Sequence, residues 1–158
     1  RCEERRTELI NFGAGEVWID DDEVPERAKE LTRGKGCVLG LNSVGGPSAL
    51  RIARSLGEGG VHVTFGAMDG SPVRFPTRSL IFDDVRFVGF WLDKWKRKQS
   101  PASLRNALEE VLQPLALTEI RHPVDKVFGL NEFEQALTRN AESRMGKVLL
   151  AREKDSLD

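Results

Sequence analysis

The stretch CVLGLNSVGGPSAL, residues 37–50, joins an apolar run of strand length to a glycine turn and the start of a helix. In open α/β sheets, ligands bind outside the carboxyl end of such a strand, against backbone N–H groups and a helix N-terminus. Pro47 suits the first helical turn, where its missing N–H costs nothing. Helical spacing then predicts that four apolar residues face the sheet: Ala49, Ile52, Ala53 and Leu56.

Strand-like and helix-like segments alternate on both sides of this stretch. We expect short strands at 17–19, 61–65, 85–92 and 148–150, with an extended segment at 119–128. We expect helices at 3–11 (ended by Gly13), 25–31, 48–56 and 101–113, and another capped by Asn131. Gly57–Gly60 is interpreted as a tight turn, and 79–82 as a short apolar segment. The alternation predicts an α/β fold with a mostly parallel sheet, half of a doubly wound one.

Composition limits the function classes. The chain has 158 residues, a single-domain length, and 24 Lys+Arg balance 25 Asp+Glu, so charge alone excludes a general polyanion-binding protein. No apolar run is long enough to span a membrane. Cys2 and Cys37 are interpreted as reduced thiols rather than a disulfide or metal site. The chain has no tyrosine and two histidines, so side chains for acid–base chemistry are few.

Three motifs carry a resemblance to a known family. They are LNSVGG at 41–46, VTFGAM at 63–68 and VGFWL at 88–92, the last followed by Trp95. Together with residues 1–14, 131–137 and 146–150, they resemble the mitochondrial 2-enoyl thioester reductases of the medium-chain dehydrogenase/reductase superfamily. The resemblance covers nearly the whole chain. Its implied fold is the C-terminal portion of a doubly wound Rossmann cofactor domain (1–120), followed by the closing helix and strand of the catalytic domain (121–158).

The resemblance implies NADPH-dependent reduction of the trans-2 double bond of an acyl-CoA or acyl-carrier-protein substrate, in the mitochondrion. It implies cofactor contacts from two turns and two basic residues, Arg1 being expected on the adenosine 2′-phosphate. The full set of expected contacts is Arg1, Asn42, Phe65, Gly66, Ala67, Met68, Phe90, Trp91, Leu92, Asp93 and Lys147. The sequence departs from the family at Phe65, where Tyr is commoner, and at Ala67, where Gly is commoner. The family's dimer continues the sheet through Val85–Phe90, so a homodimer or larger complex is expected.

Two hallmarks of a complete reductase have no match in this sequence. It contains no G-x-G-x-x-G fingerprint and no tyrosine that could donate the proton. In the strand order 3-2-1-4-5-6, these residues would supply strands 3, 4, 5 and 6. We therefore expect an N-terminal half or a partner chain to supply strands 1 and 2. The chain would be a portion of a longer polypeptide, half of a split protein, or a degenerate subunit; the alternative function is a non-catalytic structural or assembly subunit.

Simpler interpretations compete at several positions. Asn42 and Ser43 are common turn formers, and Phe90 and Trp91 suit an apolar core. Residues 20–23 are acidic and are expected to form a solvated loop rather than a metal site. His62 is expected to be structural. The basic residues Lys94, Lys96, Arg97 and Lys98 form either a solvated face or a docking patch for an acidic carrier protein or RNA, although nucleic acid is not the expected partner.

Overall fold

The computed structural model describes residues 5–117 and 123–152. The chain divides into two compact units, unit 1 (Arg1–Gln99) and unit 2 (Ser100–Asp158). Each unit is described by itself. The division after Gln99 places the long helix α6 (Pro101–Ala116) with the C-terminal elements. The functional boundary predicted at residue 120 stays a prediction.

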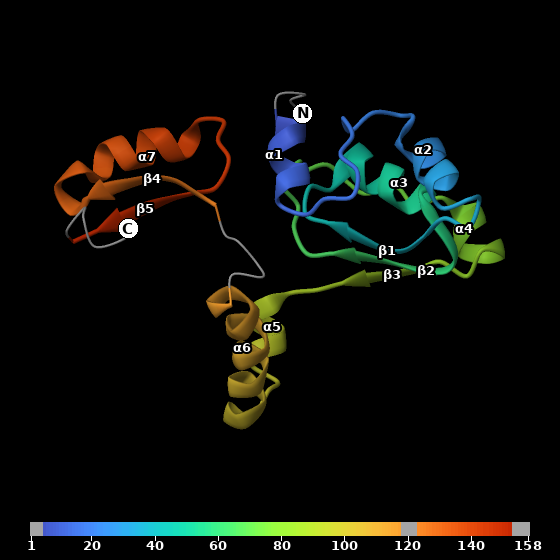
Figure 1. The fold of residues 1–158 in the computed structure, drawn as a ribbon. Coiled ribbons are helices and arrows are strands. Elements are labelled where there is room, and N and C mark those ends of the chain that lie inside the picture. The colour runs from blue at the N-terminus through green and yellow to red at the C-terminus, as the bar shows by residue number, and fades with distance from the viewer. Residues whose placement is uncertain (1–4, 118–122, 153–158) are drawn as a thin grey trace. The chain divides into compact units, whose positions relative to one another are not determined.

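Unit 1 is built on a three-stranded parallel sheet in the order β1-β2-β3 (Figure 1). The strands are β1 (Cys37–Asn42), β2 (Leu56–Thr64) and β3 (Arg86–Gly89), joined by α3 (Gly46–Arg54) and α4 (Thr77–Phe82). Asn42 pairs with Thr64, and Thr64 pairs with Gly89, so all three strands end at the same level. The predicted α/β class with parallel strands is confirmed, and the three carboxyl ends lie side by side.

Helix α3 covers one face of this sheet, and α2 (Val24–Leu31) packs beside α3 (Figure 1). Ala49 and Ala53 of α3 are buried, as the helical spacing predicted. A Cβ added at Gly40 would lie 2.4 Å from Cγ2 of Ile52, so the helix approaches the bare backbone of β1. The same face buries His62, whose ring packs against Phe87 at 5.3 Å. This face is the core of unit 1.

The opposite face of the sheet is exposed among the described residues. Leu39, Leu41 and Val88 point to that side and are each about half exposed or more. Within the part of the chain that the structure describes, β1 pairs with β2 alone and leaves its other edge unpaired. Unit 1 therefore has an apolar face and a strand edge with no covering element in residues 5–99.

The tight turn predicted at Gly57–Gly60 is wrong. These four residues lie inside β2. Cys37 pairs with Leu56 and Leu39 pairs with Val61, so one residue of β1, Val38, lies opposite four residues of β2. The backbone just before β1 touches β2 here, since a Cβ added at Gly57 would lie 1.9 Å from the carbonyl oxygen of Lys35. Only glycine tolerates this approach at position 57, and residues 57–60, which resemble a turn in the sequence, make an irregular bulge in the strand.

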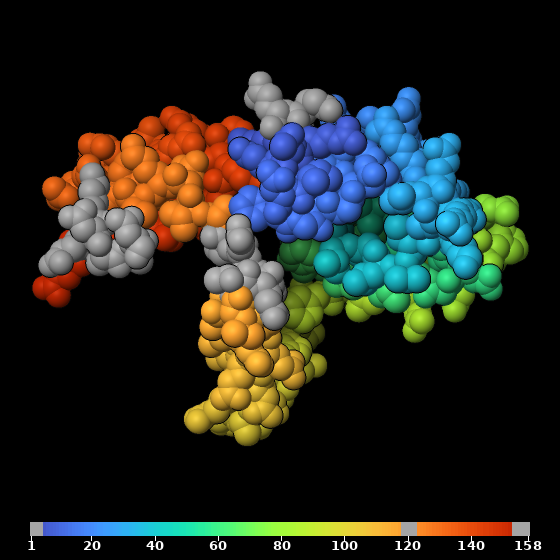
Figure 2. Space-filling view, viewed as in Figure 1, coloured from blue at the N-terminus to red at the C-terminus, as the bar shows by residue number. Residues whose placement is uncertain are grey.

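Three further elements differ from the predictions. Residues 17–19 are irregular rather than a strand, because no described strand lies beside them to pair with their backbone. The segment at 79–82 belongs to helix α4. The strand predicted at 85–92 ends at Gly89, and a short helix, α5 (Leu92–Lys96), begins at Leu92. Helix α1 (Arg6–Asn11) is followed by Gly13 at φ +97°, as predicted, and lies on the surface of unit 1 (blue in Figure 2).

The acidic run at 20–23 is a network of ion pairs. Asp20 and Asp22 bind Arg51 of α3 at 3.2 and 2.9 Å, and Asp21 binds Arg27 of α2 at 3.3 Å. The loop before α2 is thereby tied to two helices. Among residues 5–117 and 123–152, no three His, Cys, Asp or Glu side chains are grouped as a metal site would require.

Unit 2 contains α6 (Pro101–Ala116) and a two-stranded parallel sheet of β4 (Val124–Gly129) and β5 (Lys147–Ala151). Ser100 caps α6, because its Oγ accepts a hydrogen bond from the Ser103 N–H at 3.1 Å. Asn131 is not a cap, because a 3-10 turn, η2 (Leu130–Glu132), precedes α7 (Phe133–Ala141). No helix in the described ranges has the length and hydropathy needed to cross a bilayer.

Asp125 of β4 and Arg139 of α7 form a two-pronged ion pair at 2.6 and 2.7 Å. This pair fixes α7 against the small sheet. The Arg139 guanidinium holds the pKa of the Asp125 carboxyl below its usual range.

Candidate functional site

Three turns meet where the strands of unit 1 end. The Phe65 N–H donates to the Asn42 carbonyl oxygen at 2.9 Å, and the Asp69 N–H donates to that of Val44 at 2.8 Å. The Phe90 N–H donates to the Thr64 carbonyl oxygen at 2.8 Å. The turn after β2 is thus bonded to the turn after β1, and the turn after β3 is bonded to the end of β2.

Asn42 lies beneath the first turn, with an exposed fraction of 0%. Its Oδ1 accepts hydrogen bonds from the N–H groups of Val44 and Gly45, at 3.1 and 2.9 Å. Its Nδ2 donates to Oγ1 of Thr64 at 3.2 Å. The side chain therefore folds the turn after β1 and links it to β2.

Glycines allow these turns to approach one another. Gly45 and Gly46 have φ values of +87° and +52°, a region that side-chain-bearing residues rarely adopt. A Cβ added at Gly66 would lie 2.5 Å from the Ser43 carbonyl oxygen. Ala67, by contrast, is exposed, so its methyl group does not crowd the turns themselves.

Most of the predicted cofactor contacts gather around these turns. Asn42, the turn 65–68 and the segment 90–93 lie at one end of the sheet. Phe65, Met68, Phe90 and Trp91 are exposed there, Trp91 with 62% of its surface accessible. The interpretation of Phe90 and Trp91 as core side chains is therefore wrong within the described residues.

The basic segment after β3 is partly neutralised by Asp93. Asp93 accepts a hydrogen bond from Arg97 and lies 3.7 Å from the Lys96 Nζ. The Arg97 guanidinium also lies 5.7 Å from the ring centre of Trp91. Asp93 and Trp91, both predicted cofactor contacts, are thus held by α5. The docking patch for an acidic partner stays a prediction.

Thr64 is the site residue that sequence reasoning passed over, and it lies beside His62, which is expected to be structural. The Thr64 Oγ1 lies 3.4 Å from the His62 Nδ1, and the His62 ring is 1% exposed. Burial lowers the pKa of His62, so the ring stays neutral. His62 and Thr64 are two residues apart on one strand, so their side chains face the same side of the sheet. This spacing was the signal that could have placed Thr64 beside His62.

Two predicted contacts do not belong to the described part of unit 1. Lys147 is the first residue of β5 in unit 2, where it is exposed and its N–H donates to the Pro123 carbonyl oxygen at 2.9 Å. Arg1 lies outside the described residues. The structure therefore brings together the residues of unit 1 only.

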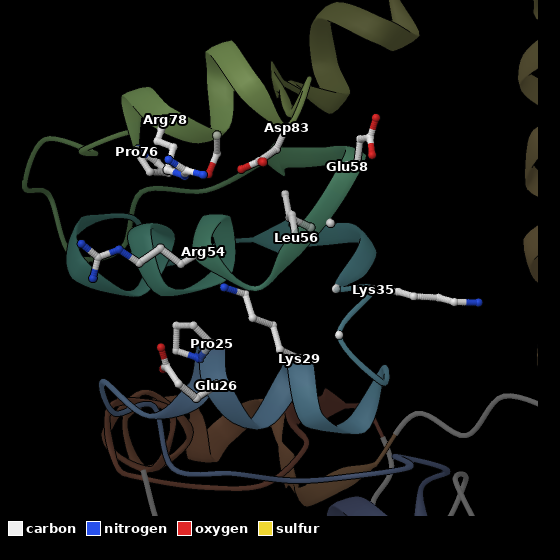
Figure 3. Close-up of a pocket in the computed structure, with 14 residues that line it drawn as sticks. Pro25, Glu26, Lys29, Lys35, Arg54, Leu56, Glu58, Pro76, Arg78 and Asp83 are labelled. Atoms are coloured by element: carbon white, nitrogen blue, oxygen red, sulfur yellow. The ribbon is translucent and has the colours of Figure 1, made fainter.

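Two cavities flank the sheet. One, of about 460 Å³, lies beside the turns and is lined by Gly46, Pro47 and Arg74, among others. The other, of about 880 Å³, lies at the amino ends of the strands, between α2, α3 and α4 (Figure 3). None of the predicted cofactor contacts lines this second cavity. Its lining carries charged side chains of both signs: Glu26, Lys29, Lys35, Arg54, Glu58, Arg78 and Asp83.

A sequence model of the family described as zinc-binding dehydrogenase matches residues 1–113. The chain belongs to this family. As a zinc-binding dehydrogenase family member it carries no grouped metal ligands within 5–117 and 123–152, so the described residues do not form a zinc site.

The curated relatives that this family member matches include mitochondrial enoyl-[acyl-carrier-protein] reductases. The one from Caenorhabditis elegans is 40% identical over 70% of this chain and 31% of its own length. The one from Dictyostelium discoideum is 32% identical over 71% of this chain and 32% of its own length. The resemblance inferred from the three motifs is confirmed, and the chain spans about a third of the length of these relatives.

Solved structures share the fold of this zinc-binding dehydrogenase family member. A candidate NADPH:quinone reductase from Bacillus thuringiensis matches with a TM-score of 0.77 and 26% identity, over 91% of this chain and 44% of its own. The Etr1p/Etr2p heterodimer of mitochondrial 2-enoyl thioester reductase from Candida tropicalis matches with a TM-score of 0.76 and 22% identity, over 90% of this chain and 43% of its own. An Etr1p variant in complex with NADP and crotonyl-CoA matches with a TM-score of 0.71 and 23% identity, over 87% of this chain and 41% of its own.

Proposed function

We propose that this chain forms part of an NADPH-dependent 2-enoyl thioester reductase, which reduces the trans-2 double bond of an acyl-CoA or acyl-carrier-protein substrate in mitochondrial fatty acid synthesis. One observation carries the proposal. The turns after β1, β2 and β3 meet at the carboxyl end of a parallel sheet, where open α/β sheets bind ligands. The names of the curated relatives supply the reaction class.

The three strands correspond, in this proposal, to strands 4, 5 and 6 of a doubly wound Rossmann sheet. The unpaired edge of β1 and the apolar face at Leu39 and Leu41 support it, because strand 4 of such a sheet pairs with strand 1 and both faces are covered. An N-terminal half or a partner chain would supply strands 1 and 2. The edge of β3 would continue the sheet into a homodimer or a larger complex.

The residues of the turns fit a dinucleotide. Gly45 and Gly46 leave the start of α3 without side chains, and a Cβ at Gly46 would lie 2.5 Å from Oδ1 of Asp69. Phe65, Met68, Phe90 and Trp91 offer exposed apolar surface for a flat ring. NADPH, when bound, supplies the hydride for the alkene. The chain contains no tyrosine, so the proton donor comes from the rest of the protein.

Two basic residues complete the proposed cofactor contacts. Lys147 of unit 2 is exposed and free to meet an anionic group. Arg1 is proposed on the 2′-phosphate, where a charge-assisted hydrogen bond is worth roughly 1.5–3 kcal/mol. Arg1→Ala should then weaken the binding of NADPH about ten- to hundredfold and leave the affinity for NADH nearly unchanged. Titration of the complete protein with each cofactor measures this. Equal losses for both cofactors would place Arg1 elsewhere.

A thermal melt of the complete protein with and without NADPH tests the proposal, on wild type and on Trp91→Phe. Wild type should show a clear upward shift at millimolar NADPH, because a ligand that binds only the folded state stabilises it. Trp91→Phe should have a melting temperature near that of wild type without cofactor, and NADPH should raise it by less than in wild type. If NADPH produces no shift in wild type, the enzyme proposal is wrong and a non-catalytic assembly subunit takes its place.

A further inference from the structure

Asn42 is fully buried, and both polar atoms of its side chain are hydrogen-bonded within unit 1. Its Oδ1 accepts from two backbone N–H groups, its Nδ2 donates to Thr64, and the residue is fully buried. The N–H groups of Val44 and Gly45 are occupied by the same Oδ1. The first turn therefore presents neither the Asn42 amide nor these two backbone donors to a bound anion.

Asn42 and Thr64 together touch all three turns. The Asn42 side chain holds the turn after β1, and its carbonyl oxygen accepts from Phe65 in the turn after β2. The Thr64 carbonyl oxygen accepts from Phe90, which begins the turn after β3. The bond from the Asn42 Nδ2 to the Thr64 Oγ1 joins the two residues at 3.2 Å.

The His62 ring is a second hydrogen-bond partner for the Thr64 hydroxyl. The Thr64 Oγ1 accepts a hydrogen bond from the Asn42 Nδ2, so its own O–H can donate to the His62 Nδ1, 3.4 Å away. The buried ring is neutral and packs against Phe87. Thr64 is thus held from both sides, in a region where an unpaired polar group is costly.

We propose that Asn42 and Thr64 are positioning residues that hold the turns after β1, β2 and β3 as one unit, and that Asn42 acts on the cofactor through the turn rather than by contact. The effect on the cofactor rests on the proposed function, whereas the effect on the turns does not. Removing the Thr64 hydroxyl should loosen the turns and weaken cofactor binding, because the Asn42 amide loses its hydrogen-bond partner.

The experiment uses the full-length protein with Thr64→Val, which keeps the side-chain shape and removes the hydroxyl. Thr64→Ser retains the hydroxyl and is the rescue variant, and Thr77→Val makes the same change at the exposed first residue of α4. Asn42→Ala removes the acceptor itself. Backbone amide exchange at Val44 and Gly45, without cofactor, reports on the turn, and an NADPH titration well below the melting temperature reports on the cofactor.

We expect amide exchange at Val44 and Gly45 to accelerate at least tenfold in Asn42→Ala and several-fold in Thr64→Val, and to stay at the wild-type rate in Thr64→Ser and Thr77→Val. The NADPH Kd should rise about tenfold in Thr64→Val, the equivalent of one hydrogen bond, and return in Thr64→Ser. Should Asn42→Ala fail to fold, the Thr64 variants decide by the same two measurements.

Unchanged exchange at both amides in Thr64→Val would overturn the proposal. Accelerated exchange with an unchanged Kd would overturn the claim that the pair positions the turns for the cofactor. If wild type binds no NADPH but the two amides exchange faster in Thr64→Val, the pair does hold the turns and the proposed reductase function is wrong.

Discussion

The two faces of the unit 1 sheet are made by alternate residues of the same strands, yet they have opposite surroundings. Gly40 and His62 face α3 and are buried, whereas their neighbours Leu39 and Leu41 point the other way and are exposed. Strands that are apolar on both sides are typical of parallel sheets covered on both faces. The contrast teaches that the exposed face is built for burial, by an element outside residues 5–99.

The largest expected effect follows from the open face and the unpaired edge of β1. Residues 1–158 expressed alone should be insoluble or molten, because the exposed leucines and unpaired backbone groups favour association. Circular dichroism melts and size-exclusion chromatography at micromolar concentration measure this. A cooperative thermal transition of a monomer would show that the open face needs no cover.

The control for this prediction alters the open face itself. Leu39→Lys with Leu41→Lys should raise the solubility of the isolated chain, since both side chains are exposed there. In the complete protein, the same double change should destabilise the fold, because it buries charge under the covering element. An equal effect in both contexts would count against a covered face.

A methyl group added to the buried face gives the next largest effect. Gly40→Ala in the complete protein should lower the free energy of unfolding by about 1–3 kcal/mol, because the new Cβ meets Ile52. Gly89→Ala is the matched control, since a Cβ there meets no heavy atom within 4 Å among the described residues. Both glycines lie on the face that packs on α3, since Gly40 pairs with His62 and Gly89 pairs with Thr64. Denaturant unfolding curves measure both, and similar losses would show that the contact with Ile52 is not the cause.

The buried histidine makes stability depend on pH. Burial lowers the pKa of His62 in the folded state, so below its unfolded value of about 6.5 the unfolded chain binds more protons. The free energy of unfolding should therefore fall as the pH drops from 7.5 to 5.5, by at most about 1.4 kcal/mol per pH unit from this group. His62→Leu should flatten this part of the profile, measured by chemical unfolding at each pH. Asp125 titrates at lower pH and leaves this window unaffected.

The smallest effect on stability is expected at Trp91. With 62% of its surface exposed, Trp91→Ala should change the free energy of unfolding by less than about 1 kcal/mol, against 3–5 for a buried tryptophan. Chemical unfolding of the complete protein checks this. A loss in the larger range would mean that the rest of the protein covers Trp91, and would assign the residue to the core.

Local patterns predicted the order of the elements around residues 37–50 well. The apolar run of β1 has strand length, the glycines at 45 and 46 permit the positive φ of a turn, and the proline at 47 suits the first helical turn. Strand, turn and helix follow from these residues in that order. The three motifs also placed Phe65–Met68 and Phe90–Asp93 at one site, because the carboxyl ends of parallel strands meet. The family resemblance came from the same motifs.

Only the tertiary structure decided the rest, because it depends on which backbones meet. Gly57–Gly60 resembles a turn until β1 lies against it, and residues 17–19 resemble a strand until no described strand pairs with them. The burial of Asn42 and its hydrogen bond to Thr64, 22 residues away in sequence, depend on the pairing of β1 with β2. Sequence alone determines which residues can form strands, turns and caps, whereas pairing and burial determine which of their polar atoms remain for function.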